Sequence, residues 1–142
     1  MRKLEKAWVL TLRALDTLTA YTKYSADRLS VAVVNPKQTL LKPGAYVEVD
    51  SEPLEDSDSS AVQQSDVTVF LVATKRGDVL EMAQILENEC RNENDSEKKF
   101  DISNADVYCI SNTWVSNGRP KWSDALDCFE MPVNFVTLWS LK

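Results

Sequence analysis

The sequence predicts an α+β sandwich, in which one mixed or antiparallel sheet of about four to five strands packs against two main helices. Two segments repeat apolar residues at helical spacing, over residues 4–18 and 78–90. Four segments have the apolar or alternating pattern of strands, over residues 45–49, 67–74, 106–115 and 128–141. Their order is α-β-β-α-β-β, and the length of 142 residues predicts a single domain, residues 1–142.

The first helix is predicted from one apolar stripe, which consists of Leu4, Trp8, Leu12, Leu15 and Leu18. Spacings of three and four residues place these side chains on one face of a helix. Residues 25–44 are irregular and contain two prolines. The short apolar run of residues 31–34, which starts at Val31 and ends at Val34, is a candidate extra edge strand.

The two strands of the first half differ in pattern. Residues 45–49 follow the turn signal Pro43-Gly44. Residues 67–74 are β-branched and apolar on both faces, which predicts a central strand covered on both sides. Between them, residues 50–66 are rich in serine and every charge is negative, which predicts a mobile acidic loop.

The second helix has a start signal and the last strand has a break signal. Asp78 is predicted as the N-cap, and Glu81 stands three residues later, as in a capping box. The apolar stripe of this helix ends at Cys90. In the last strand, Pro132 indicates an edge position or a bulge. Residues 118–127, which include Trp122, are predicted as a loop or flap between the final two strands.

Composition argues against several classes of function. The net charge of −6, with scattered basic residues, argues against sequence-specific nucleic-acid binding and favours a partner with a basic surface. The sequence has no apolar run long enough for a membrane span. It has no histidine, and Cys90, Cys109 and Cys128 form no C-x-x-C pair. We therefore expect no metal site, and reduced thiols packed as small core residues.

No catalytic or cofactor-binding motif stands out in the sequence. Histidine-dependent triads are impossible, and three glycines are too few for a phosphate-binding loop. We expect no enzymatic activity and no cofactor. A small enzyme that uses carboxylates alone is a third hypothesis, although catalytic carboxylates need a rigid, partly desolvated setting that a serine-rich loop does not supply.

Candidate functional residues are therefore residues of a protein interface. The acidic loop contributes Glu52, Glu55, Asp56 and Asp58 as groups that could pair with a basic surface, or that simply form a solvated charged run. Trp122 lies in the predicted loop beside the basic residues Arg119 and Lys121. Such a tryptophan stacks on a nucleic-acid base, anchors a protein interface or folds back over the sheet.

Three segments carry a resemblance to a known family. They are residues 42–49 (Lys-Pro-Gly-Ala-Tyr-Val-Glu-Val), residues 66–72 (Asp-Val-Thr-Val-Phe-Leu-Val) and Gly77 at the start of the second helix. In these segments and in element order, size and acidity, the chain resembles the tail terminator, or tail completion, proteins of long-tailed bacteriophages. The resemblance covers most of the chain, but not residues 25–44 or 119–127.

The resemblance implies a structural role in a virion. Proteins of this family form a ring, typically a hexamer, that caps the tail tube and presents a surface to the head-side connector. It implies as partners other copies of the chain, the tail tube protein and the connector or stopper protein. It also implies synthesis in the host cytoplasm and a final place at the head-tail junction. The alternative is a small adaptor or regulatory module that binds a basic protein through its acidic loop or a sheet edge.

Overall fold

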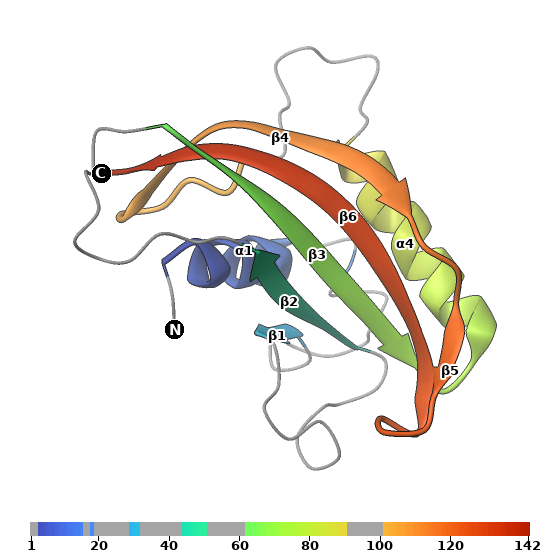
Figure 1. The fold of residues 1–142 in the computed structure, drawn as a ribbon. Helices are drawn as coiled ribbons and strands as arrows, with labels where there is room; N and C mark the ends of the chain where they lie inside the picture. Colours follow the sequence, from blue (N-terminus) through green and yellow to red (C-terminus); the bar gives the residue numbers. More distant parts are fainter. Residues whose placement is uncertain (1–2, 16–17, 19–28, 32–43, 51–61, 91–100) are drawn as a thin grey trace.

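In the computed structural model, the described residues are 3–15, 18, 29–31, 44–50, 62–90 and 101–142. They form helices α1 (Lys3–Ala14) and α4 (Arg76–Cys90) and one six-stranded sheet (Figure 1). The long strands are β2 (Gly44–Asp50), β3 (Gln63–Ala73), β4 (Val107–Asn117) and β6 (Cys128–Leu141). They confirm the predicted class and order, and two three-residue strands, β1 (Leu29–Val31) and β5 (Lys121–Ser123), add to them.

The strand order is β1-β2-β3-β6-β4, and β5 also pairs with β6. β1 runs parallel to β2 and all other pairs are antiparallel, so the sheet is mixed. β1 overlaps the candidate edge strand at Val31, and residues 32–34 lie outside the described residues. β5 lies inside the segment predicted as a loop, which is therefore partly a strand.

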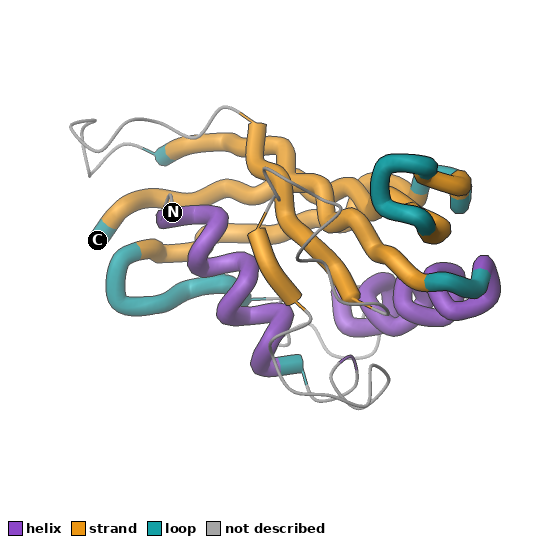
Figure 2. The backbone as a smooth tube through the Cα atoms, turned by 90° about the horizontal axis from the view of Figure 1, so that it is seen from below, coloured by secondary structure: helices purple, strands orange, loops and turns teal. Residues whose placement is uncertain are grey.

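One face of the sheet forms the core with both helices. Val47, Val69 and Val133 face one another in register across three strands and are fully buried. The helices cover this face with buried side chains, namely Leu4, Trp8 and Leu12 of α1 and Val79, Met82 and Leu86 of α4. Figure 2 shows both helices on the same side of the sheet. The molecule is therefore a two-layer sandwich, as predicted.

Indole groups satisfy the buried polar side chains of this core. Among the described residues, Ser65 and Thr137 are the buried polar ones. Trp139 donates its indole N–H to Ser65 Oγ at 3.0 Å, and Trp8 donates to Thr137 Oγ1 at 3.2 Å. These hydrogen bonds remove the cost of burying a hydroxyl in an apolar layer.

The helix ends differ from the predictions. α4 begins at Arg76, and Asp78 N–H donates to Lys75 O at 3.1 Å, so the capping box starting at Asp78 is wrong. Asp78 instead lies in the first turn, where its negative charge still complements the helix dipole. α1 ends at Ala14 rather than at Leu18, and a hydrogen bond from Leu15 N–H to Leu12 O at 3.2 Å tightens its last turn.

β3 is central, as predicted, but it is not covered on both sides. Gln64 and Asp66 are exposed, and Thr68 and Phe70 are only partly buried on the face away from the helices. Both faces of β3 are buried only at its end, where the successive residues Val72 and Ala73 point to opposite faces and are both buried. The physical reason is that α1 and α4 pack on a single side of the sheet.

Pro132 lies in β6, which is an interior strand. The predicted edge position is therefore wrong. β6 pairs with β3 on one side and with β4 and β5 on the other. Gly118 N–H donates to Pro132 O at 2.7 Å, at the break between β4 and β5. In a strand, the N–H and C=O of one residue point to the same side, so the missing N–H of Pro132 faces this break. The bulges lie in β4 instead, at Ile110 and Val115.

Candidate interaction surfaces

The sheet face opposite the helices, which we call the open face, carries mostly polar and aromatic side chains. Three rows of residues cross it in register. They are Tyr46, Phe70 and Pro132 in the first row, Glu48, Thr68 and Asn134 in the second, and Asp50, Asp66 and Val136 in the third. Within the described residues no helix covers these rows, which leaves the face available for contact.

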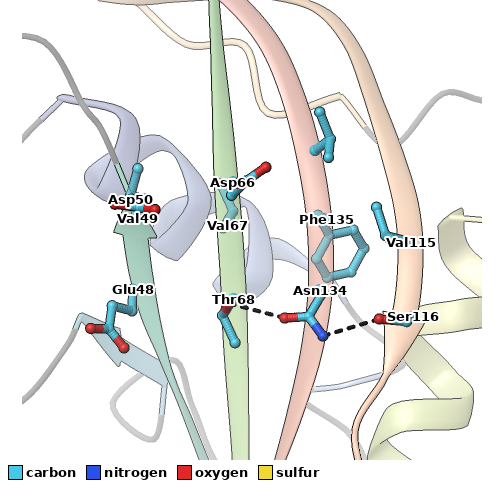
Figure 3. A pocket seen from close by; sticks show the side chains of 11 residues that line it. Glu48, Val49, Asp50, Asp66, Val67, Thr68, Val115, Ser116, Asn134 and Phe135 are labelled. Carbon is cyan, nitrogen blue, oxygen red and sulfur yellow. Dashed lines mark hydrogen bonds between the residues drawn. The ribbon is translucent and has the colours of Figure 1, made fainter.

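A groove of about 600 Å³ runs across the second and third rows, from β2 to β4 (Figure 3). Thr68 Oγ1 donates to Asn134 Oδ1 at 3.1 Å, and Asn134 Nδ2 donates to Ser116 Oγ at 3.2 Å. This chain of hydrogen bonds fixes the floor of the groove from β3 to β4. Because these side chains are already ordered, they lose little conformational entropy when another molecule binds to them.

Carboxylates concentrate on the β2–β3 side of the groove. Asp50 and Asp66 are direct cross-strand partners, and Glu48 lies one row away on the same face. Like charges directly opposite each other do not stabilise the pairing of two strands. None of the described residues that line the groove is lysine or arginine, so all the charged side chains of this lining are acidic.

A separate cluster closes one end of the open face. Tyr46 donates its hydroxyl proton to Glu130 Oε2 at 2.6 Å, and its ring stacks on Phe70 with centroids 4.8 Å apart. Beside Tyr46, Leu126 of the β5–β6 turn packs on Val72 and Cys128. The turn itself contains Asp127 in the left-handed region, with φ of 54°. Burial, and then the hydrogen bond to Glu130, raise the pKa of Tyr46 well above its usual range.

We expect the Tyr46→Phe substitution to lower the free energy of unfolding by about 1–3 kcal/mol near neutral pH, because a charge-assisted hydrogen bond is lost. The difference should shrink above about pH 10, where tyrosine ionises in the unfolded chain. The raised pKa means that the folded state favours the protonated hydroxyl. As the pH rises, the parent therefore loses free energy of unfolding, whereas the phenylalanine variant has no hydroxyl to ionise. Urea unfolding of both proteins at several pH values measures the difference in their free energies of unfolding. A difference that grows with pH would contradict this assignment.

The predicted interface residues divide into two groups. Glu52, Glu55, Asp56 and Asp58 lie outside the described residues. Trp122 is in β5, and its side chain is 51% exposed. Its indole N–H donates to Asp124 Oδ1 at 3.1 Å, and its ring meets Phe129 edge-on, with centroids 5.2 Å apart. The side chain is therefore held in place on one edge and offers half of its surface to a partner.

The fold of the chain is similar to that of a chain in one solved structure. A chain in a structure described as "Virion of native gene transfer agent (GTA) particle" has the same fold. The two superpose with a TM-score of 0.55, over 96% of this chain and 94% of the other, at 17% sequence identity. No family model matches the sequence, and no curated protein matches it.

Sequence reasoning missed the groove. It treated Asp50 and Asp66 as parts of one loop, whereas both are strand residues that face each other. A usable signal was present, because Glu48, Asp50, Asp66 and Thr68 occupy alternate positions of two adjacent strand segments. Alternation places such residues on one face. Asn134 and Ser116 gave no comparable signal, because which strand pairs with β3 depends on the topology.

The three cysteines, all of which are described residues, form no disulfide bond and contact the core. Cys128 is buried, while Cys90 and Cys109 are partly buried and pack against the main core cluster. Burial, helped by the charge of Glu89, raises the pKa of Cys90 to about 12, so its thiol is protonated near neutral pH. The described residues contain no group of three side chains that could hold a metal ion. None of the helices in this part of the chain is long and apolar enough to cross a membrane.

Proposed function

We propose that the chain is a structural protein of a phage-like virion, and that it acts as a tail terminator or tail completion protein. In this role, copies form a ring, expected to be a hexamer, that caps the tail tube and joins it to the head-side connector or stopper protein. The observation that carries the proposal is the full-length match in fold to a chain of a gene transfer agent virion. The element order, which resembles tail terminator proteins, supports the finer assignment.

The physical character of the molecule suits a geometric role without a catalytic step. A single core joins both helices to the sheet, which gives a stiff body. One sheet face is open, and Trp122 offers an exposed aromatic surface at the β5–β6 turn. Assembly proteins need such complementary surfaces between copies and between stacked rings. The place of action proposed here is the head-tail junction, after synthesis in the host cytoplasm.

Deletion of the gene from the genome that encodes the chain tests the proposal. We expect tail tubes of uncontrolled length and heads without tails, seen by electron microscopy of the lysate. Supplying the chain in trans should restore particles with tails of uniform length. Particles of normal form and infectivity after deletion would refute the proposal.

Charge reversal tests the predicted interface residues separately. We expect a Glu55→Lys, Asp56→Lys double variant to reduce the yield of complete particles at least about tenfold without unfolding the monomer, because it replaces attraction to a basic surface by repulsion. The matched control is Glu81→Lys with Glu87→Lys on α4, which changes the net charge equally. Parallel measurements with Glu52→Lys, Asp58→Lys and Trp122→Ala complete the series. If only the α4 control loses yield, the acidic loop does not contact a basic surface during assembly.

The acidic groove on the open face favours a second candidate function. In that case the chain is a non-enzymatic adaptor that binds a basic protein and has no place in a virion. Quantitative mass spectrometry of purified particles separates the two functions. A tail terminator is present in a fixed number of copies per particle, whereas an adaptor remains in the unassembled fraction.

A further inference from the structure

We propose that the groove on the open face is a docking site for a segment of a partner protein that presents lysine or arginine side chains. The groove, rather than the acidic loop alone, then holds the partner. This proposal does not depend on the virion role, because it concerns binding by the isolated chain outside any particle. Three features of the molecule support it, namely the uncovered sheet face, the charges of the groove and the apolar side of the groove.

The groove lies on a sheet face that no described helix covers. Both α1 and α4 bury their apolar stripes on the opposite face. Four strands contribute side chains to the groove, from Glu48 on β2 to Ser116 on β4 (Figure 3). A segment lying across the strands can therefore contact all four strands at once.

Charge complementarity identifies the occupant as basic. The exposed carboxylates of Glu48, Asp50 and Asp66 stand on one side of the groove. These residues also border the most acidic stretch of the sequence. Residues 48–66 contain no lysine or arginine, and their acidic residues are Glu48, Asp50, Glu52, Glu55, Asp56, Asp58 and Asp66. Since Asp50 and Asp66 are direct cross-strand partners, one basic side chain can contact both carboxylates.

The other side of the groove is apolar, which favours a long basic side chain. Val115 is 51% exposed at a bulge of β4, and Val136 of β6 is partly buried beside it. Lysine and arginine can pack their aliphatic stems on such a surface while their charged ends reach carboxylates. Between the two sides, the hydrogen-bonded Thr68, Asn134 and Ser116 form a polar floor that is already ordered.

The test titrates the isolated, isotope-labelled protein with a synthetic peptide that alternates lysine or arginine with alanine. We expect the amide signals of Thr68, Ser116 and Asn134 to move most, and the affinity to fall as the salt concentration rises from about 0.05 to about 0.5 M. A peptide of the same length with glutamate in place of the basic residues should leave these signals unchanged. Movement confined to residues outside the groove would overturn the proposal.

Two matched pairs of variants make the test specific. We expect Glu48→Gln with Asp66→Asn to weaken peptide binding about tenfold, whereas Glu81→Gln with Glu87→Gln, which changes the net charge equally, should change it less than about twofold. Val115→Ser should weaken binding about threefold to tenfold, whereas Val62→Ser, at a valine that is 62% exposed outside the groove, should not. Equal weakening by both charge pairs would mean only general attraction and would overturn the proposal.

Two further arms address other occupants. Magnesium or calcium chloride alone, at matched ionic strength, should leave the three amide signals in place, and specific movement would assign the groove to a cation instead. Dilution of the protein without peptide should also leave them in place. Concentration-dependent movement would assign the groove to a second copy of the chain.

Discussion

The Trp8→Ala substitution is expected to lower the free energy of unfolding by about 3–5 kcal/mol. Trp8 is fully buried, and its ring lies 4.8 Å from that of Phe135. Its indole N–H donates to Thr137 Oγ1 at 3.2 Å, and Thr137 Oγ1 in turn donates to Asn112 Oδ1 at 2.9 Å. The substitution therefore creates a cavity and also removes the buried donor from a hydrogen-bond chain that links α1, β6 and β4.

Circular dichroism during urea unfolding measures this loss. Leu10→Ala, at a residue of the same helix that is 44% exposed, is the matched control and should cost less than about 1 kcal/mol. Trp8→Phe keeps most of the packing and should lose about 1–3 kcal/mol, mainly from the missing N–H donor. If Trp8→Ala costs no more than Leu10→Ala, then α1 does not pack on the sheet as described.

The Gly118→Ala substitution is expected to destabilise the protein by about 1–3 kcal/mol. An added Cβ atom would overlap Cγ of Pro132 and would lie 2.9 Å from its Cδ. A proline ring has little freedom to move away, so either the Gly118–Pro132 hydrogen bond or the course of β5 must change. The close approach arises because the chain passes from β4 to β5 directly beside Pro132.

Gly77→Ala is the control, and its effect should have the opposite sign. A Cβ atom at Gly77 would meet nothing within 4 Å, and the residue lies in the first turn of α4. Alanine in a helix is more favourable than glycine by up to about 1 kcal/mol, so the variant should be slightly more stable than the parent. Thermal unfolding of both variants checks the pair. Equal effects of the two substitutions would contradict the described contact at Gly118.

Side-chain periodicity was sufficient to predict the helices and strands that have one buried and one exposed side. The stripe of Leu4, Trp8 and Leu12 correctly predicted α1, and the alternation in residues 128–141 gave the bounds of β6. Local signals near element ends were less informative. Asp78 has the chemistry of an N-cap, yet α4 starts two residues earlier. Since a helix gains one hydrogen bond for each added residue, it can begin before a residue that has the chemistry of a cap.

The interaction surfaces needed more than periodicity. Trp122 was identified as a candidate from its residue type, its predicted loop position and its basic neighbours. The structure adds that its ring is held against Phe129 with half of its surface exposed. The groove was missed because it joins residues of four strands that are far apart in the sequence. Asn134 illustrates the difficulty, since its neighbours Thr68 and Ser116 are 66 and 18 residues away along the chain.

The sequence by itself determined the class of the fold, the long elements and the acidic character of the chain, because side-chain periodicity and charge are local properties. Tertiary structure alone decided that both helices share one side of the sheet, which left the other face of β3 uncovered. It also placed β6 in the interior despite Pro132. These features depend on which strands pair and in what register, and pairing between distant segments follows from the packing of the whole core.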